Sequence, residues 1–193
     1  MGNPSRFQIK YTNMNQPEKQ KAKILDGNEV SAVLIARVRD SIEAHVKAGG
    51  RRPGLAVVLV GSDPASSIYV NAKRRDCVRA GILARDYDLD ESTSEQELLE
   101  LIDRLNEDPE INGILVQLPL PAHIHEAAVT NRISSSKDVD GFHAFNVGKL
   151  ALRQPGLRPC TPRGIMALLH YYGNANRSMH AVEVCASNIE GSP

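Results

Sequence analysis

The stretches LAVVLV (residues 55–60) and GILV (residues 113–116) decide the fold of this chain. Neither alternates apolar with polar residues, as a strand with one wet face would. A continuous apolar run of this length is typical of a strand that is buried on both faces, as strands of parallel sheets are. The two stretches therefore predict a parallel sheet that is covered by helices on both sides.

Helical patterns flank the first stretch. Asp26 has the side chain and position to cap a helix, whose apolar face is expected to pack inward and consists of Val30, Val33, Leu34, Val38, Ile42 and Val46. After the strand, residues 66–80 predict a second helix that stops at Gly81.

The strand and helix pattern then repeats. Residues 83–89 predict a short strand, and Ser92 with Glu95 has the spacing of a capping box for a helix that Pro109 closes. The apolar residues of that helix are Leu98, Leu101, Ile102 and Leu105. Strands that alternate with helices imply right-handed crossover units, so the predicted fold class is α/β, with a three-layer parallel-sheet N-terminal domain.

The remainder divides into a loop-rich stretch, one helix and the start of another domain. Residues 119–162 are expected to form loops, residues 164–172 a helix, and residues 181–184 the first strand of a Rossmann-type second domain. A single strand cannot bury its own faces, so we expect that second domain to be truncated. The predicted parts are a flexible extension (1–22), a catalytic domain (23–172) and the truncated start (173–193).

Composition excludes several classes of protein. The chain has 193 residues, of which 41% are hydrophobic and 24% charged, values of an ordinary globular protein. Its 23 basic and 23 acidic residues cancel, so no global charge favours nucleic acid or an anionic membrane. No apolar run approaches the roughly 20 residues of a membrane span. Three scattered cysteines form no CxxC pair, which favours a reducing compartment, and we expect a cytoplasmic protein.

The loops that follow the two central strands carry unusual side chains. Tyr69 and Lys73 are four residues apart on the predicted helix and share a face, while Gln117 follows GILV directly and precedes the stiff LPLP. A lysine partly removed from water exchanges protons near neutral pH, which makes Lys73 a candidate acid and base. From spacing alone, a solvated lysine and a packed tyrosine are the commoner alternatives.

A second candidate is the sequence KDVDG at residues 137–141. A solvated Asp-Gly turn is the default interpretation, and the functional one is a carboxylate that accepts two N–H bonds from a heterocycle. His123 and His125 form an HxH pair without a third ligand, so we expect no metal site.

Taken together, the motifs resemble the bifunctional methylenetetrahydrofolate dehydrogenase/methenyltetrahydrofolate cyclohydrolase family. The resemblance rests on VGSDPASSIYVNAKRRDCVRAGI, GILVQLPLP, KDVDGFHAFNVGKL and PCTPRGI, in this order between residues 24 and 172. It implies a multifunctional enzyme of one-carbon metabolism that serves purine biosynthesis. The enzyme would oxidise 5,10-methylenetetrahydrofolate with NADP and hydrolyse 5,10-methenyltetrahydrofolate to 10-formyltetrahydrofolate.

The resemblance also assigns roles to residues. Tyr69 would stack on the aminobenzoyl ring, Lys73 would carry the acid and base work, and Gln117 would orient Lys73. Asp140 would bind the pterin, and the main chain of Val116 and Leu118 would contact the substrate. Residues 23–172 would then be the folate-binding catalytic domain, and 173–193 the start of the NADP-binding domain.

The last residues depart from the family pattern, which reads approximately HAVVVGxSxxVGxP. Here residues 180–193 read HAVEVCASNIEGSP, with Glu183, Cys185 and Glu190 as departures. A buried lone carboxylate is costly, and a tight phosphate-binding turn wants glycine. The residues that would contact NADP are Ala186, Ser187 and Asn188.

Three functions remain open at this point. The first is an enzyme by descent that keeps cyclohydrolase chemistry but lacks hydride transfer, since the second reactant would not be held beside the first. The second is a non-catalytic folate-binding module, or a chain that pairs with a separately encoded partner supplying the missing domain. The third is a remnant without activity. A Rossmann oxidoreductase of another substrate class is disfavoured, because the loop after Val60 reads GSDPAS and not GxGxxG. The homodimer known for the family is not expected, because its contacts lie largely in the missing domain.

Overall fold

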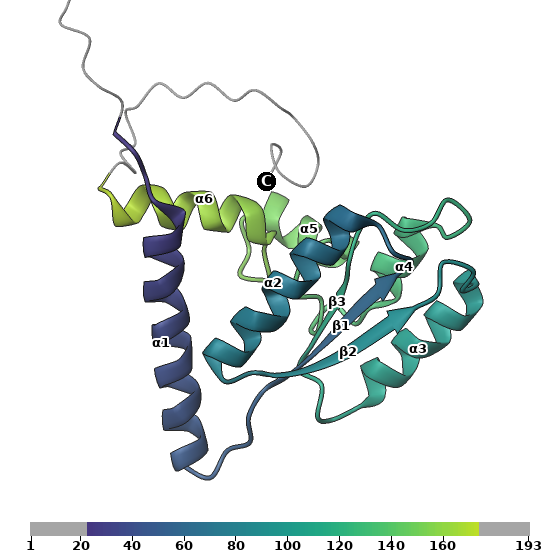
Figure 1. The fold of residues 1–193 in the computed structure, drawn as a ribbon, viewed down its shortest axis with the longest axis horizontal. Helices are drawn as coiled ribbons and strands as arrows, with labels where there is room; N and C mark the ends of the chain where they lie inside the picture. The colour runs from purple at the N-terminus through teal and green to yellow at the C-terminus, as the bar shows by residue number, and fades with distance from the viewer. Residues whose placement is uncertain (1–22, 174–193) are drawn as a thin grey trace, which may run out of the picture.

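A computed structural model describes residues 23–173 of the chain (Figure 1). In this range a sheet of three parallel strands has the order β2-β1-β3. The strands are β1 (Gly54–Val60), β2 (Leu83–Leu89) and β3 (Gly113–Val116). All four residues of β3 and six of the seven in β1 are buried, as the two apolar stretches predict.

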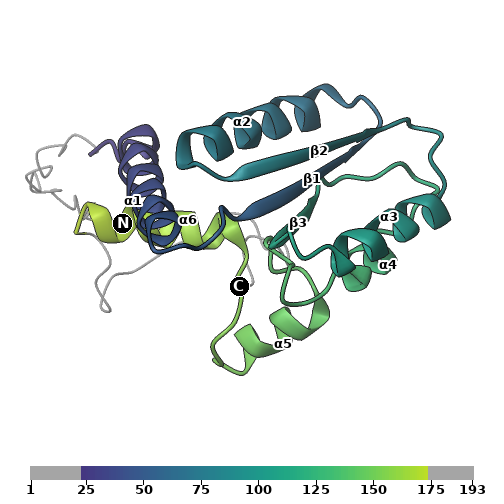
Figure 2. The same ribbon diagram turned by 90° about the horizontal axis from the view of Figure 1, so that it is seen from below.

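Helices cover both faces of this sheet. Figure 2 shows α2 (Pro64–Ala80) on one face, and α3 (Glu95–Glu107) with α4 (Glu126–Arg132) on the other. The alternating residues of β1 pack accordingly. Val57 and Leu59 form a core cluster with Val70 of α2. The opposite face of β1 belongs to the larger core cluster, which includes Leu98 of α3. The three-layer α/β prediction is confirmed.

The first helix, α1 (Gly27–Lys47), lies beside this sandwich and packs against α2. It begins as expected, because the Asp26 side chain accepts a hydrogen bond from the backbone N–H of Asn28 at 2.9 Å. The expectation that its whole apolar face packs inward is wrong. Val30 and Ile42 are buried, but Leu34 is 41% exposed and Val38 is 43% exposed. Among the described residues no further element covers this part of α1.

The expected capping box is formed by a different pair of residues. Ser94 and Glu97 cap α3 reciprocally, in place of Ser92 and Glu95. Asp90 accepts hydrogen bonds from both the N–H and the hydroxyl of Ser92, so a turn between β2 and α3 uses that serine. Both pairs satisfy the same spacing, and the turn decides between them.

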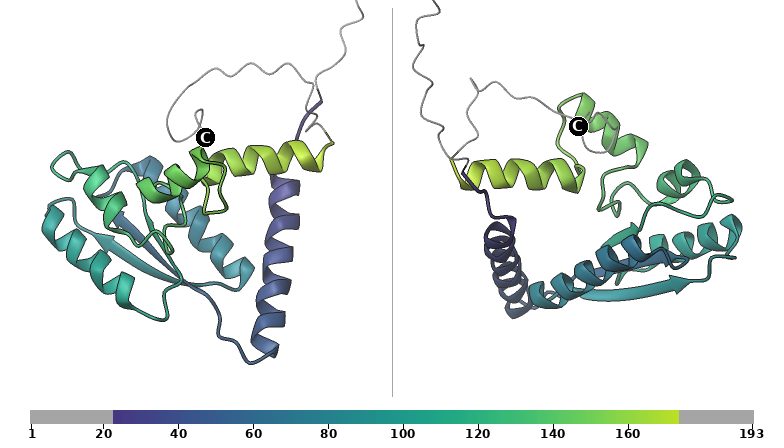
Figure 3. Two further views of the ribbon diagram at one scale, coloured as in Figure 1. Left: turned by 180° about the vertical axis from the view of Figure 1, so that it is seen from behind. Right: turned by 45° about the horizontal axis from the view of Figure 1, so that its top comes forward.

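Residues 119–162 are not all loop, contrary to expectation. They contain α4, α5 (Ala144–Ala151) and the start of α6 (Cys160–Tyr171). Helices of seven and eight residues carry too few apolar positions for a clear period, and they form here because tertiary contacts stabilise them. Figure 3 shows α6 crossing the N-terminal end of α1.

Several expectations lie outside the described residues. These are the flexible extension 1–22, the strand 181–184 and the cofactor contacts Ala186, Ser187 and Asn188. Within residues 23–173, none of the helices combines the length and the apolar character that a membrane crossing requires.

Candidate active site

Lys73 and Gln117 meet at the carboxyl ends of the strands. The ammonium Nζ of Lys73 donates a hydrogen bond to Oε1 of Gln117 at 3.0 Å, across 44 positions of sequence. The backbone of Gln117 is fixed by the sheet, because its N–H donates to the carbonyl of Val58 at 2.9 Å. The amide nitrogen of the same side chain donates to the carbonyl of Leu118. Because Gln117 Oε1 can only accept, it holds the lysine Nζ at the edge of the sheet.

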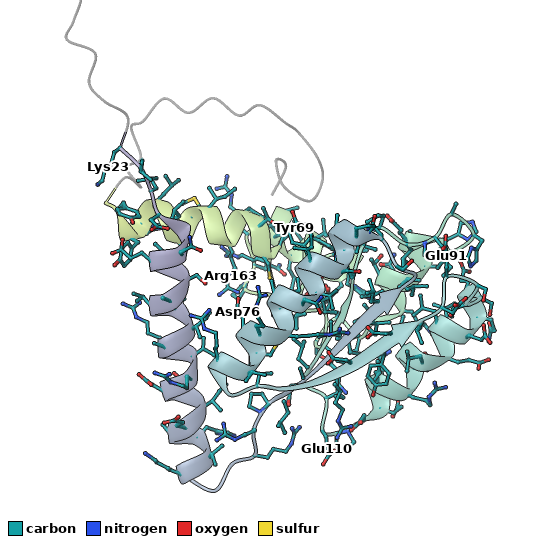
Figure 4. The ribbon with its side chains drawn as sticks, in the orientation of Figure 1. Lys23, Tyr69, Asp76, Glu91, Glu110 and Arg163 are labelled. Carbon is teal, nitrogen blue, oxygen red and sulfur yellow. The ribbon has the colours of Figure 1, made fainter. Side chains whose placement is uncertain are left out.

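Tyr69 lies one helical turn before Lys73 on α2 and is 63% exposed. Aromatic side chains of this size are usually buried, and a phenol ring in water next to an ordered lysine leaves an apolar plate free for a flat ligand. Figure 4 labels Tyr69 on α2 and Arg163 on α6, the two helices that contribute side chains to this region.

The KDVDG segment runs beside β3, and its first two charged residues are used by the fold. Ile114 of β3 pairs with Asp138 in an isolated parallel bridge. Lys137 donates from Nζ to three carbonyls at the end of α3, those of Leu105, Asn106 and Asp108. Asp138 is 3% exposed and accepts backbone hydrogen bonds from the turn that follows it.

Asp140, in contrast, is not used by the fold in this way. Its carboxylate accepts no hydrogen bond from any residue between 23 and 173. Burial, and to a smaller degree the charge of Asp138, raises the pKa of Asp140, and the nearby Lys73 ammonium opposes this. A half-buried carboxylate without donors, within reach of the charge of Lys73, suits a ligand that brings its own N–H groups.

Cys160 and Arg163 of α6 also belong to this neighbourhood, although the sequence did not single them out as site residues. Cys160 donates from Sγ to the carbonyl of Val139 at 3.3 Å, which ties the start of α6 to the residue before Asp140. Burial of the sulfur, followed by the charge of Asp140, raises the pKa of the thiol, while Arg163 and Lys73 lower it. The motif PCTPRGI contains this cysteine, but a lone cysteine between prolines does not by itself indicate a functional site.

The loop between β1 and α2 is unsuited to a dinucleotide phosphate. Asp63 caps α2 by accepting a hydrogen bond from the N–H of Ser66 at 2.7 Å, a bond that lowers the pKa of this carboxyl. The fixed negative charge occupies the helix N-terminus where a bound phosphate would otherwise lie. No group of three or more potential metal ligands occurs among the described residues.

One hollow in the described part of the chain lies away from these side chains. It has a volume of about 510 Å³ and lies between α1 and the start of β1, lined by Val38, Ile42 and Pro53 among others. This is the end of the sheet opposite to Lys73 and Gln117. We place the site at the carboxyl ends because the ordered, chemically competent side chains are there.

The fold and these side chains define a class: an α/β domain that presents a positioned lysine, an amide and a carboxylate at the carboxyl edge of a parallel sheet. Comparisons with known proteins are consistent with this class. Residues 25–140 match the family "Tetrahydrofolate dehydrogenase/cyclohydrolase, catalytic domain". The chain belongs to this family.

Similar proteins of known sequence and structure are longer than this chain. The bifunctional protein FolD of Legionella pneumophila (strain Corby) is 51% identical over 172 residues, which are 89% of this chain and 61% of that protein. The crystal structure of the FolD dehydrogenase/cyclohydrolase of Campylobacter jejuni is 45% identical, with a TM-score of 0.83, over 88% of this chain and 60% of that one.

A third similar structure is the Trypanosoma brucei FolD, which was solved in complex with NADP cofactor and inhibitor. It is 30% identical, with a TM-score of 0.78, over 88% of this chain and 58% of that one. The chain therefore spans about 60% of the length of these relatives.

Proposed function

We propose that the carboxyl edge of the sheet binds a one-carbon tetrahydrofolate and that Lys73 moves protons at its one-carbon bridge. The observation that carries the proposal is the hydrogen bond from Lys73 Nζ to Gln117 Oε1, with the unpaired Asp140 close enough to feel the charge of that lysine. Tyr69 would stack on the aminobenzoyl ring, Asp140 would accept two N–H bonds from the pterin, and the main chain of Val116 and Leu118 would line the site.

The hydrolysis of 5,10-methenyltetrahydrofolate needs such a proton carrier. Water adds to the cationic methenyl carbon, and the bond from that carbon to N5 then breaks, which leaves the formyl group on N10. The attacking water gives up both of its protons as its oxygen becomes the formyl carbonyl, and N5 takes up one, so the reaction releases one proton in total. The ammonium of Lys73, fixed by Gln117, would give a proton to N5 as the bond from the carbon to N5 breaks, and would take back the proton of the added hydroxyl as the formyl carbonyl forms.

The oxidation of 5,10-methylenetetrahydrofolate with NADP is the second reaction that we propose for the enzyme type. The cofactor would accept a hydride from the one-carbon bridge. The contacts that we expect for it, Ala186, Ser187 and Asn188, lie outside the described residues, and the β1–α2 loop does not fit its phosphates. We therefore derive no step of this oxidation from the structure.

Two finer points are also proposals. The absence of a CxxC pair among the three scattered cysteines supports a cytoplasmic enzyme, and 10-formyltetrahydrofolate would serve purine biosynthesis. A non-catalytic folate-binding module is the alternative, and measurement of turnover separates it from an enzyme.

The test is the loss of methenyltetrahydrofolate, followed as a progress curve and corrected for spontaneous hydrolysis in the same buffer. The wild-type chain, Lys73→Ala and Lys47→Ala are compared, because Lys47 is an exposed lysine at the far end of α1. We expect acceleration by the wild type and Lys47→Ala, and a rate lower by about 10²- to 10⁴-fold for Lys73→Ala. Equal acceleration by Lys73→Ala would contradict the role of this lysine, and no acceleration by any protein would favour the binding module.

A further inference from the structure

Two buried polar residues next to the site have no role in the chemistry above. Asp138 and Asn146 are each 3% exposed. A carboxylate removed from water needs compensation from hydrogen-bond donors. Among residues 23–173 the donors to Asp138 are all neutral, since the lysine of the same motif, Lys137, donates to the end of α3.

The donors to Asp138 enclose the turn that carries Asp140. Oδ1 accepts from the N–H groups of Gly141 at 3.0 Å and Phe142 at 3.3 Å. Oδ2 accepts from the N–H of His143 at 2.9 Å and from the amide Nδ2 of Asn146 at 2.8 Å. Three successive N–H groups after Asp140 are thus directed at one carboxylate, so the direction of Asp140 depends on that of Asp138.

Asn146 is the side chain that holds this carboxylate. Besides its bond to Asp138, its Nδ2 donates to the carbonyl of Ser135 at 2.8 Å, so it joins the turn to the chain before KDVDG. The turn has no slack, because Gly141 has φ +72° and a Cβ there would lie 2.7 Å from the backbone carbon of Arg158. A change at Asn146 would therefore remove one of the four donors to Asp138 and loosen its hold on the turn that carries Asp140.

We infer that Asn146 is a positioning residue for the folate site, acting through Asp138 to orient Asp140. This inference rests on the proposed function for its ligand, a folate. Its structural part, that Asn146 holds the turn after Asp138, does not depend on that ligand. Asn146 touches neither the substrate nor the reacting atoms. It supplies the one side-chain donor that the buried carboxyl group of Asp138 receives in the described part of the chain.

Two substitutions separate this role from plain structural support. Asn146→Leu removes the donor at every pH. Asn146→Asp places a second carboxyl against Asp138, and the pair then shares one proton at low pH, since two carboxylates in hydrogen-bond contact cannot both ionise readily. That shared proton restores a donor to Asp138, so Asn146→Asp regains the function at low pH and loses it as the pH rises.

Other titratable groups lie near Asp138, and the wild type controls for them. Asp140, Lys73, Cys160 and Arg163 interact electrostatically in this region. The His143 ring accepts a hydrogen bond from the N–H of Phe145 through Nδ1. Their titration is common to the wild type and both variants, so the ratio of variant to wild-type affinity isolates position 146.

The experiment measures the affinity for 5-formyltetrahydrofolate, a chemically stable one-carbon folate, by calorimetry between pH 5.5 and 8. Relative to the wild type, Asn146→Leu should bind about 10- to 100-fold more weakly at all pH values, as expected for the loss of a hydrogen bond to a buried charge. Asn146→Asp should bind within about threefold of the wild type at pH 5.5 and about tenfold or more weakly at pH 8. A flat ratio for Asn146→Asp, or an unchanged affinity for Asn146→Leu, would overturn the inference.

Amide proton spectra of Gly141, Phe142 and His143 test the same claim without ligand. Their shifts should report the carboxylate-bound turn in the wild type, and in Asn146→Asp at pH 5.5 but not at pH 8. If the wild type binds no folate, the proposed function fails, while these spectra still decide whether Asn146 holds the turn. Spectra of Asn146→Asp that do not change between the two pH values would contradict the positioning role.

Discussion

The two ends of the sheet are both rich in polar side chains, but they use them differently. At the amino edge, Arg51 donates to the carbonyls of Pro109 and Glu110 and to Oδ1 of Asn112. Arg85 forms ion pairs there with Asp108 and with Glu110.

At the carboxyl edge, Lys73 and Gln117 bind each other, and Tyr69 and Asp140 make no side-chain hydrogen bond within residues 23–173. Polar groups that satisfy one another hold the fold, while groups left unsatisfied are available to a ligand. The comparison supports the proposal that the ligand binds at the carboxyl edge, although a hollow lies at the amino edge.

The largest effect should follow from removing the free carboxylate of the carboxyl edge. Asp140→Asn should weaken the binding of 5-formyltetrahydrofolate by about 100-fold, because two charge-assisted hydrogen bonds are lost. The free energy of unfolding should stay unchanged or rise, since a half-buried carboxylate without donors is removed. Calorimetry and urea unfolding measure both quantities, with Asp76→Asn on α2 as the control. Equal binding by Asp140→Asn and the wild type would break the comparison.

A substitution in the turn beside Asp140 should affect both stability and binding. Gly141→Ala places a Cβ at φ +72°, 2.7 Å from the backbone of Arg158. We expect a loss of about 2 kcal/mol in the free energy of unfolding and weaker folate binding. Gly148→Ala is the matched control, because a Cβ at that helical glycine of α5 meets no atom within 4 Å. Similar unfolding curves for the two variants would contradict the strain at Gly141.

A substitution at the amino edge should lower stability and leave folate binding unchanged, which is the opposite of the result expected for Asp140→Asn. Lys137→Met removes three hydrogen bonds to the last carbonyls of α3 but keeps the length of the side chain. It should lower the free energy of unfolding by about 2 kcal/mol and leave the folate affinity of the folded protein unchanged. Urea unfolding and calorimetry check this. A folate affinity that falls together with stability would show that the two edges are not independent.

The smallest effect concerns pH. Burial raises the pKa of Asp140, so a proton competes with the ligand at a higher pH than for an ordinary aspartate, whose pKa is about 3.9. Folate affinity should therefore fall as the pH decreases through that raised value. The raised pKa also means that Asp140 holds its proton more tightly in the folded chain than in the unfolded chain. Its contribution to the free energy of unfolding is therefore greatest at low pH and is lost as the pH rises.

The Lys73 ammonium is the group that lowers the pKa of Asp140, so Lys73→Met should move this affinity profile to higher pH. Calorimetry across the acid range measures the shift, and an unmoved profile would contradict the coupling of the two side chains.

Local patterns predicted much of this fold. The two apolar stretches, the Asp26 cap and the stop at Gly81 depend on residues close in sequence, and the structure confirms them. The capping box shifted from Ser92 to Ser94 because a side chain outside the motif, Asp90, binds the first serine.

The helices α4 and α5 were missed because packing, and not their own period, stabilises them. The contacts of the site are likewise non-local. Spacing put Tyr69 and Lys73 on one face, but it could not distinguish Asp138 from Asp140, since the two differ only in the donors that the folded turn supplies.

The most direct test of the central claim is to map the binding of 5-formyltetrahydrofolate onto backbone amide signals of the wild-type chain. We predict that the signals of Tyr69, Lys73, Gln117 and Asp140 shift on binding while those of Arg51 and Asn112 stay in place. Shifts centred on Arg51, Ser41 and Asn112, around the hollow at the amino edge, would contradict the assignment of the site to the carboxyl edge.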